Sequence, residues 1–169
     1  MEEAIDFGTV DDRGRNCVML ACENGDLERV KYLISKGGSV HVVDPYEQSC
    51  LHIACYRKHV DVVKYLLDEG VDVNKKDKAD FVCFHWACDG EVNIKIIEML
   101  LNAGVDDVNA QTTNGTTPFM FNCWYGTREQ IQMVLDAGAD WRLKDNHGET
   151  GLDVARIHNN KGVVIWLEG

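Results

Sequence analysis

Two short segments carry cysteine and histidine at spacings typical of metal ligands. The motif is Cys-x-His-x-x-Cys, and its two copies are Cys50-x-His52-x-x-Cys55 and Cys83-x-His85-x-x-Cys88. Thiolates and imidazoles are the ligands that zinc prefers. On an α-helix, however, Cys50 and His52 point about 200° apart, and Cys50 and Cys55 about 140° apart. Three side chains with these directions cannot converge on one ion, so we expect no metal site.

The two histidines could also act as general acids or bases. No serine, cysteine or carboxylate stands at a position that would complete a catalytic triad with His52 or His85. The sequence also lacks a glycine-rich loop that would bind phosphate groups. We therefore expect no catalytic residue, no cofactor and no enzyme activity.

The two motifs lie 33 residues apart because a period of about that length runs along the chain. Five units can be aligned, and their first residues are spaced 33, 33, 35 and 33 positions apart. These first residues are Asp11, Asp44, Asp77, Thr112 and Asp145. One offset holds Ala21, Ala54, Ala87, Asn122 and Ala155, and an apolar pair near the end of four units precedes Gly37, Gly70, Gly104 and Gly138. A fixed period of this length indicates a stacked repeat architecture.

Each unit has the pattern of two short helices. In the second unit Ser49 can cap a first helix, and Gly70 suits the left-handed residue that ends the second helix. Asn16, Thr117 and Thr150 occupy the same capping position in other units. The apolar residues Val62, Val63, Leu66 and Leu67 form one stripe at helical spacing. One such pair cannot bury its own apolar face, so the units must stack, and we expect helices to cover most of each unit.

These features resemble the ankyrin repeat family. Its signature, Thr-Pro-Leu-His-x-Ala, appears as Ser49-Cys50-Leu51-His52-Ile53-Ala54 and, more loosely, as Val82-Cys83-Phe84-His85-Trp86-Ala87, while Thr117-Pro118-Phe119 keeps its start. A Gly-x-Asp-x-Asn turn is present as Gly70-Val71-Asp72-Val73-Asn74. The resemblance implies an all-α solenoid of antiparallel helix pairs with projecting hairpin-like loops, called fingers below. It also implies that His52 and His85 join neighbouring loops by hydrogen bonds.

The resemblance extends over residues 11–169. We expect residues 1–10 to form a short helical or extended cap, followed by repeats one to five. Their ranges are 11–43, 44–76, 77–111, 112–144 and 145–169, and the last is a truncated or capping repeat. Repeat three has two extra residues and places Asp80 and Val82 where the family has glycine and threonine, so its interhelix turn and its finger should be irregular. In repeat four Asn122 replaces alanine, and a buried amide there should find hydrogen-bond partners.

Composition limits the partners and the compartment. The 169-residue chain has a formal net charge of −11, which argues against a nucleic-acid or anionic-membrane surface. No apolar run is long enough to predict membrane insertion, and the acidic start Met-Glu-Glu-Ala-Ile predicts no secretory signal. Seven cysteines are an odd number, typical of reduced thiols in the cytoplasm, with the nucleus as an alternative. We expect a monomer.

A binding face is the strongest functional prediction. In the family, contacts come from the finger tips and from the solvent-facing ends of the first helices. At these positions the chain has large aromatic residues and an arginine, which are the residue types that dominate protein interfaces. They are Tyr46, Tyr56, Arg57, Phe81, Trp124 and Tyr125. We expect them to form one strip that binds a protein or peptide, whereas Trp86 and Trp141 should be packed inside and the position of Trp166 is left open.

Two other functions remain open. Asn74 and Asn109 lie in the turns after Leu66 and Leu101, similar to the pattern that asparaginyl hydroxylases accept in ankyrin repeats, so the chain could be a regulated adaptor and a substrate. The simpler interpretation is that asparagine supports the turn by local hydrogen bonds. A purely structural spacer is the third possibility, and it predicts an inner face without aromatic residues.

Overall fold

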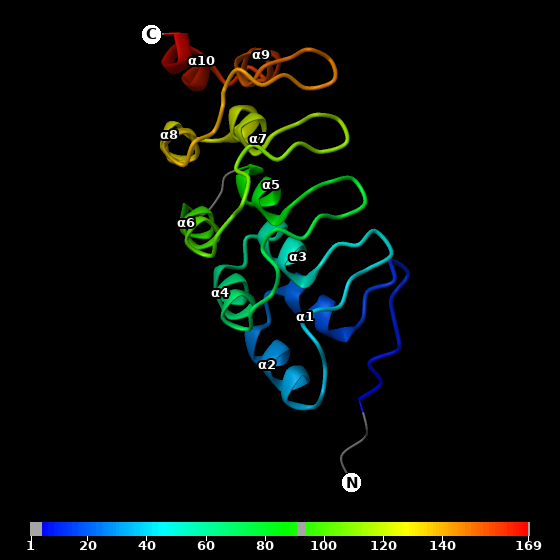
Figure 1. Ribbon diagram of the computed structural model, residues 1–169. Coiled ribbons are helices and arrows are strands. Elements are labelled where there is room, and N and C mark those ends of the chain that lie inside the picture. The colour runs from blue at the N-terminus through cyan, green and yellow to red at the C-terminus, as the bar shows by residue number, and fades with distance from the viewer. Residues whose placement is uncertain (1–4, 91–93, 169) are drawn as a thin grey trace.

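The computed structural model describes residues 5–90 and 94–168 of the chain. Within these ranges it contains ten helices in five successive pairs and no β-strand (Figure 1). The pairs are α1 (Cys17–Asn24) with α2 (Leu27–Ser35), α3 (Cys50–Tyr56) with α4 (Val60–Asp68), α5 (Cys83–Cys88) with α6 (Ile94–Asn102), α7 (Pro118–Tyr125) with α8 (Arg128–Asp136), and α9 (Gly151–Ile157) with α10 (Lys161–Glu168). The predicted all-α solenoid is confirmed.

The helices begin where the sequence predicts caps. The side chain of Asn16 accepts hydrogen bonds from two backbone amides of α1, and Ser49, Thr117 and Thr150 each accept one at the starts of α3, α7 and α9. Val82 has no side-chain oxygen, and the helix it precedes, α5, is the shortest at six residues. Because the helices are only six to nine residues long, they cover about half of each repeat, so the expectation that they cover most of it is wrong.

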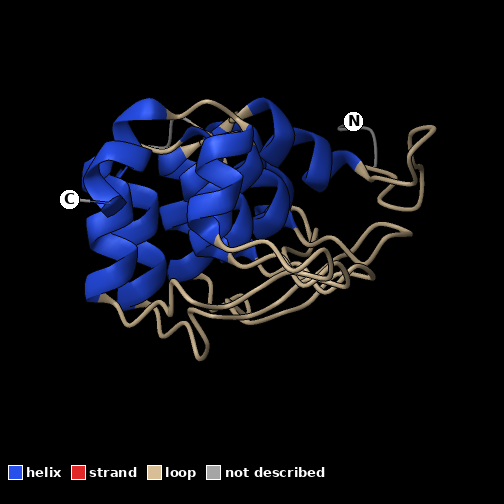
Figure 2. Cartoon of the chain, turned by 90° about the horizontal axis from the view of Figure 1, so that it is seen from above, coloured by secondary structure: helices blue, strands red, loops and turns tan. Residues whose placement is uncertain are grey.

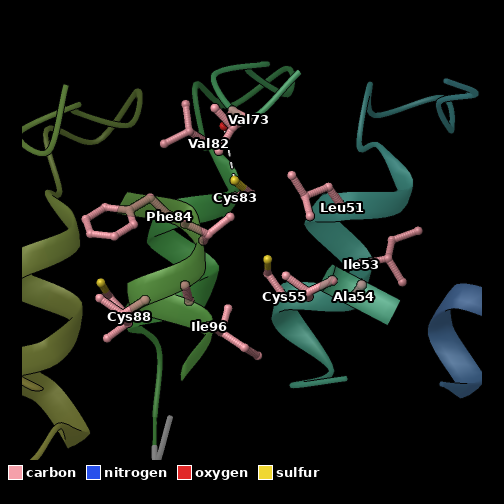
Figure 3. Packing of buried hydrophobic residues seen from close by; sticks show 14 of the residues in the cluster. Leu51, Ile53, Ala54, Cys55, Val73, Val82, Cys83, Phe84, Cys88 and Ile96 are labelled. Carbon is pink, nitrogen blue, oxygen red and sulfur yellow. Dashed lines mark hydrogen bonds between the residues drawn. The ribbon is translucent and has the colours of Figure 1, made fainter. Parts of the chain in front are cut away.

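The first helices of the pairs form one row and the second helices a row behind it (Figure 1). Each first helix contacts the next one along the stack, from α1 to α9. The core lies between the rows and between successive pairs, and Figure 3 shows the part around Leu51, Phe84 and Ile96. The Cys83 thiol in this core donates a hydrogen bond to the carbonyl oxygen of Val73 (3.1 Å). The apolar face of each repeat is therefore buried by the neighbouring repeats, as the period predicts.

The fingers project together from one side of the stack (Figures 1 and 2). One backbone N–H joins each finger to the preceding one: Lys78 donates to Tyr46, Thr113 to Ala79 and Asn146 to Asn114, each at 3.0 Å between nitrogen and oxygen. These hydrogen bonds make the fingers of repeats two to five a continuous sheet-like edge.

The finger of repeat three is regular, so the prediction of an irregular one is wrong. Asp80 adopts the same left-handed backbone as Glu47, its counterpart in repeat two, with φ of 61° and 62°. Glycine provides this conformation in the other fingers, at Gly14, Gly115 and Gly148. The interhelix turn of repeat three differs at its start, because α5 ends at Cys88 and Asp89 is extended. Residues 91–93 of that turn lie outside the described part.

The N-terminal segment packs on the first repeat without forming a helix in its described part, residues 5–10. Ile5 and Phe7 contact the core. A side chain at Gly38 would lie within 2.8 Å of the Phe7 ring, so glycine permits this close packing. Residues 5–10 of the predicted cap contain no helix, while residues 1–4 lie outside the described part.

Asn122 does not behave as expected. Its side chain is fully buried in the first helix of repeat four, and neither its amide nitrogen nor its amide oxygen has a hydrogen-bond partner among the described residues. The thiol of Cys88 lies near this amide. Burial raises the pKa of the Cys88 thiol, and the Asn122 amide lowers it in part. The prediction of a satisfied amide is therefore wrong.

Candidate interaction face

The two histidines of the repeated motif, His52 and His85, have structural roles. Nδ1 of His52 accepts the backbone N–H of Ser49 (3.2 Å), and its Nε2 donates to the carbonyl oxygen of Phe81 in the next finger (3.1 Å). His85 repeats this arrangement with Val82 (3.1 Å) and Ala110 (2.9 Å). Burial lowers the pKa of His52, and it lowers the pKa of His85 to about 4. Both imidazoles are therefore neutral, with both ring nitrogens engaged, and they join neighbouring loops as the resemblance implies.

The side chains of the Cys50-x-His52-x-x-Cys55 motif face two different neighbouring repeats. Cys50 lies against the Cys22 thiol of repeat one, and Cys55 lies against the Cys83 thiol of repeat three. His52 points to the finger of repeat three. Within the described ranges no three potential ligands are grouped around one point, and the cysteines are unbridged. The cysteines and the histidine of this motif therefore stand at positions that contact neighbouring repeats.

The finger asparagines also link repeats. The amide nitrogen of Asn74 donates to the carbonyl oxygen of Gly104 (3.1 Å), and its amide oxygen accepts the backbone N–H of Asp106 (3.0 Å). Asn109 makes the same two bonds to the following repeat, at 3.1 and 2.7 Å. Each asparagine side chain therefore stabilises the turn of the following repeat rather than its own turn. Both the nitrogen and the oxygen of its amide group form hydrogen bonds.

The six predicted binding residues all lie at least partly at the surface. Tyr46, Tyr56 and Tyr125 expose 65%, 48% and 56% of their area, and Arg57 is exposed as well. Phe81 and Trp124 are half-buried. The structure arranges the aromatic members as two groups, one around Trp86 and one around Trp124, with Tyr46 apart at a finger tip.

The first group is centred on Trp86, which sequence reasoning placed in the core. Trp86 is half-buried instead: Phe81 stacks on it at 4.6 Å between ring centroids, and Tyr56 meets it edge-on at 5.2 Å. Phe121 of repeat four contacts Phe81 at 5.8 Å. The signal that could have found Trp86 is its register. It aligns with Ile53, three residues before Tyr56, and residues three apart share one face of a helix.

The second group is a stack of three rings. Trp124 lies between Tyr125, at 5.2 Å, and His158 of repeat five, at 3.9 Å. The planes are within about 25° of parallel in both pairs, at 19° and 24°. No ring contact among the described residues joins this stack to the group around Trp86.

A pocket of about 120 Å³ adjoins the first group, between the first finger and α3. Ile53, Tyr56 and Trp86 form its apolar side. On the polar side the carboxylate of Glu23 accepts one arginine on each oxygen, Arg15 at 2.6 Å and Arg57 at 2.5 Å. These contacts lower the pKa of Glu23, chiefly through Arg57. Sequence reasoning missed the pocket, because its walls come from three different repeats.

The other two tryptophans lie near the C-terminal end. Trp141, which was expected beneath its loop, exposes 47% of its area, and the guanidinium of Arg142 covers its ring at 4.8 Å. The backbone turn there leaves the ring outside the core. Trp166 is half-buried, with Arg128 at 5.5 Å from its ring.

None of the helices in the described ranges is long and apolar enough to cross a membrane.

Comparisons with known proteins agree with this architecture. A family model described as ankyrin repeats in three copies matches residues 1–77, and one described as ankyrin repeats in many copies matches residues 100–155. A protein of Dirofilaria immitis named L-asparaginase is 34% identical over 167 residues. That alignment covers 98% of this chain but 22% of the relative, so the chain spans about a fifth of the length of that protein. With five stacked helix pairs, linked fingers and matches to ankyrin repeats in both halves, the chain belongs to the ankyrin repeat family.

Proposed function

We propose that the chain is a non-catalytic interaction module that binds a partner protein or peptide on the face formed by the first helices and the fingers, called the inner face below. One observation carries the proposal: Tyr46, Tyr56 and Tyr125 are exposed on the fingers and first helices, and Tyr56 and Tyr125 each belong to a larger aromatic group. Ankyrin repeats generally mediate protein–protein interaction, so the coarse function follows from the family.

Physical chemistry favours these residues as contacts. Aromatic side chains bury a large area with few rotamers to fix, and they are enriched among the residues that dominate binding free energy. The spacer function predicts a polar inner face, and the group around Trp86 and the stack around Trp124 argue against it.

The net charge and the buried thiols bear on the partner class and on the compartment. A net charge of −11 disfavours nucleic acid as the partner. The buried thiols suit a reducing compartment, so the proposal places the protein in the cytoplasm or nucleus, as a monomer. Hydroxylation of Asn74 and Asn109 has less support, since both amides are engaged between repeats.

A double substitution tests the proposal. We expect Tyr56→Ala with Tyr125→Ala to keep the fold, because both rings are largely exposed, and to lose the partner in affinity capture from a native lysate followed by mass spectrometry. The matched control is Tyr32→Ala, which removes an exposed tyrosine from α2, in the outer row. Capture unchanged by the double substitution, or reduced equally by the control, would refute binding through the inner face.

A further inference from the structure

We propose that the pocket between the first finger and α3 binds an acidic residue of a partner peptide together with the apolar side chain next to it. The inference rests on the proposed function, because it assigns partner chemistry to one part of the inner face. Apolar area and positive charge meet in this pocket, and each selects one feature of the peptide.

The apolar side sets the size of the side chain. Ile53, Tyr56 and Trp86 surround a volume of about 120 Å³. This volume corresponds to about four water molecules in the liquid. A leucine-sized side chain, with four heavy atoms, matches it, whereas a tryptophan does not. Because Phe81 stacks on Trp86 and Tyr56 meets it edge-on, the wall of the pocket is held in place before the peptide arrives.

The charges at the rim favour a carboxylate. Arg15 is held by Asp11 at 2.8 Å and by Glu23 at 2.6 Å, and Arg57 shares Glu23. Arg13 also lines the pocket, is exposed, and forms no ion pair within the described part of the chain. Three arginines and one carboxylate, Glu23, therefore line the pocket, in a chain of net charge −11. A guanidinium in this position pairs with a carboxylate by charge-assisted hydrogen bonds.

Titration of ¹⁵N-labelled protein with defined peptides tests the inference. The probes are Ac-Gly-Asp-Leu-Gly-NH₂ and two variants, one with Asn for Asp and one with Ala for Leu. The Trp86→Phe variant identifies the indole signal of Trp86 in the ¹H–¹⁵N spectrum. We expect the Asp-Leu peptide to shift that signal in a saturable way, and each variant peptide to bind at least about tenfold more weakly.

Arginine substitutions locate the charge. Arg13→Ala should weaken binding of the Asp-Leu peptide about fivefold, and the loss should shrink at high salt because the pair is exposed. Arg142→Ala is the matched control, since Arg142 is an exposed arginine in a different repeat, and it should leave binding unchanged. No shift of the Trp86 signal, equal affinity for the Asn-Leu peptide, or an equal response to inorganic phosphate would each overturn the inference.

The two proposals fail in different ways. If the peptides do not bind but the tyrosine double variant still loses its captured partner, the inner face remains the binding site and only the acidic-peptide chemistry is overturned. If the double variant keeps its partner while Arg13→Ala weakens the Asp-Leu peptide, the pocket chemistry stands and the wider face is refuted.

Discussion

Repeats three and four place different residues at the same two buried positions of the first helix. Where repeat three has His85, repeat four has Met120, whose sulfur takes the place of the imidazole nitrogen as acceptor for the capping backbone N–H, at 3.5 Å from Thr117. Where repeat three has Ala87, repeat four has the unpartnered Asn122. At these two positions, repeat three has no unpartnered polar side chain, whereas repeat four has the unpartnered amide of Asn122.

The difference shows what the fold requires and what it tolerates. Both repeats form the same helix pair, so apolar burial between neighbours is sufficient to define the architecture. The histidine link adds stability and fixes the next loop, but repeat four forms without it. In a stack whose stability sums over repeats and their interfaces, unequal polar satisfaction implies unequal local stability. We expect repeat four to open more readily than repeat three.

Substitution of His85 should have the largest effect. His85→Ala removes a fully buried ring and leaves the Val82 N–H and the Ala110 carbonyl without their partner. We expect a loss of about 3–4 kcal/mol in the free energy of unfolding, measured by urea denaturation. His147→Ala, at an exposed finger position, is the control and should change it by less than about 0.5 kcal/mol. A loss below about 1 kcal/mol for His85→Ala would contradict the structural role of the histidine.

The pH dependence of stability should follow the same histidine. Burial lowers the pKa of His85 to about 4, whereas an unfolded histidine titrates near 6.5. As the pH falls from about 6.5 to about 4, the unfolded chain takes up a proton that the folded chain excludes, so stability decreases with falling pH. His85 accounts for about 3 kcal/mol over this range. His85→Met, which introduces the residue of repeat four, should flatten the decline in urea denaturation series. An unchanged pH profile would exclude His85 as its source.

Removal of the unpartnered amide should stabilise repeat four. Asn122→Ala restores the residue found at this position in repeats one, two, three and five, and it removes two buried polar atoms without partners. We expect a gain of about 1–2 kcal/mol in the free energy of unfolding. Ala87→Asn in repeat three is the reverse test and should destabilise. A loss on Asn122→Ala would mean that the amide has a partner after all, such as a bound water molecule.

These examples show which parts of the molecule the sequence could predict. Caps such as Ser49 and Thr117 were predictable because capping is local and the repeat supplied the register. The lack of a hydrogen-bond partner for Asn122 could not be predicted, because it depends on the side chains of adjacent repeats. Trp86 was predicted to be buried because it aligns with the buried Ile53. The alignment identifies the position on the helix, but it does not show that the larger indole ring extends into solvent. The pocket escaped prediction for a related reason: Glu23 and Trp86 are distant in sequence and meet only in the stack.

The smallest effect should come from the inner face, where repeats three and four share one feature, a tryptophan whose indole N–H has no partner among the described residues. These tryptophans are Trp86 and Trp124. Trp86→Phe and Trp124→Phe keep an aromatic ring for stacking on Phe81 and on His158 and remove a donor that forms no hydrogen bond. We therefore expect each substitution to change the free energy of unfolding by less than about 1 kcal/mol, and by similar amounts.

Similar changes in the free energy of unfolding for the two tryptophan variants would show that repeats three and four behave alike on the inner face, although they differ at the buried positions. A loss above about 2 kcal/mol for either tryptophan would show that its N–H has a structural partner, and the comparison would then extend to the inner face as well. If both variants are as stable as the parent but Trp86→Phe alone weakens the Asp-Leu peptide, the indole ring of repeat three, which lines the pocket, contributes to binding.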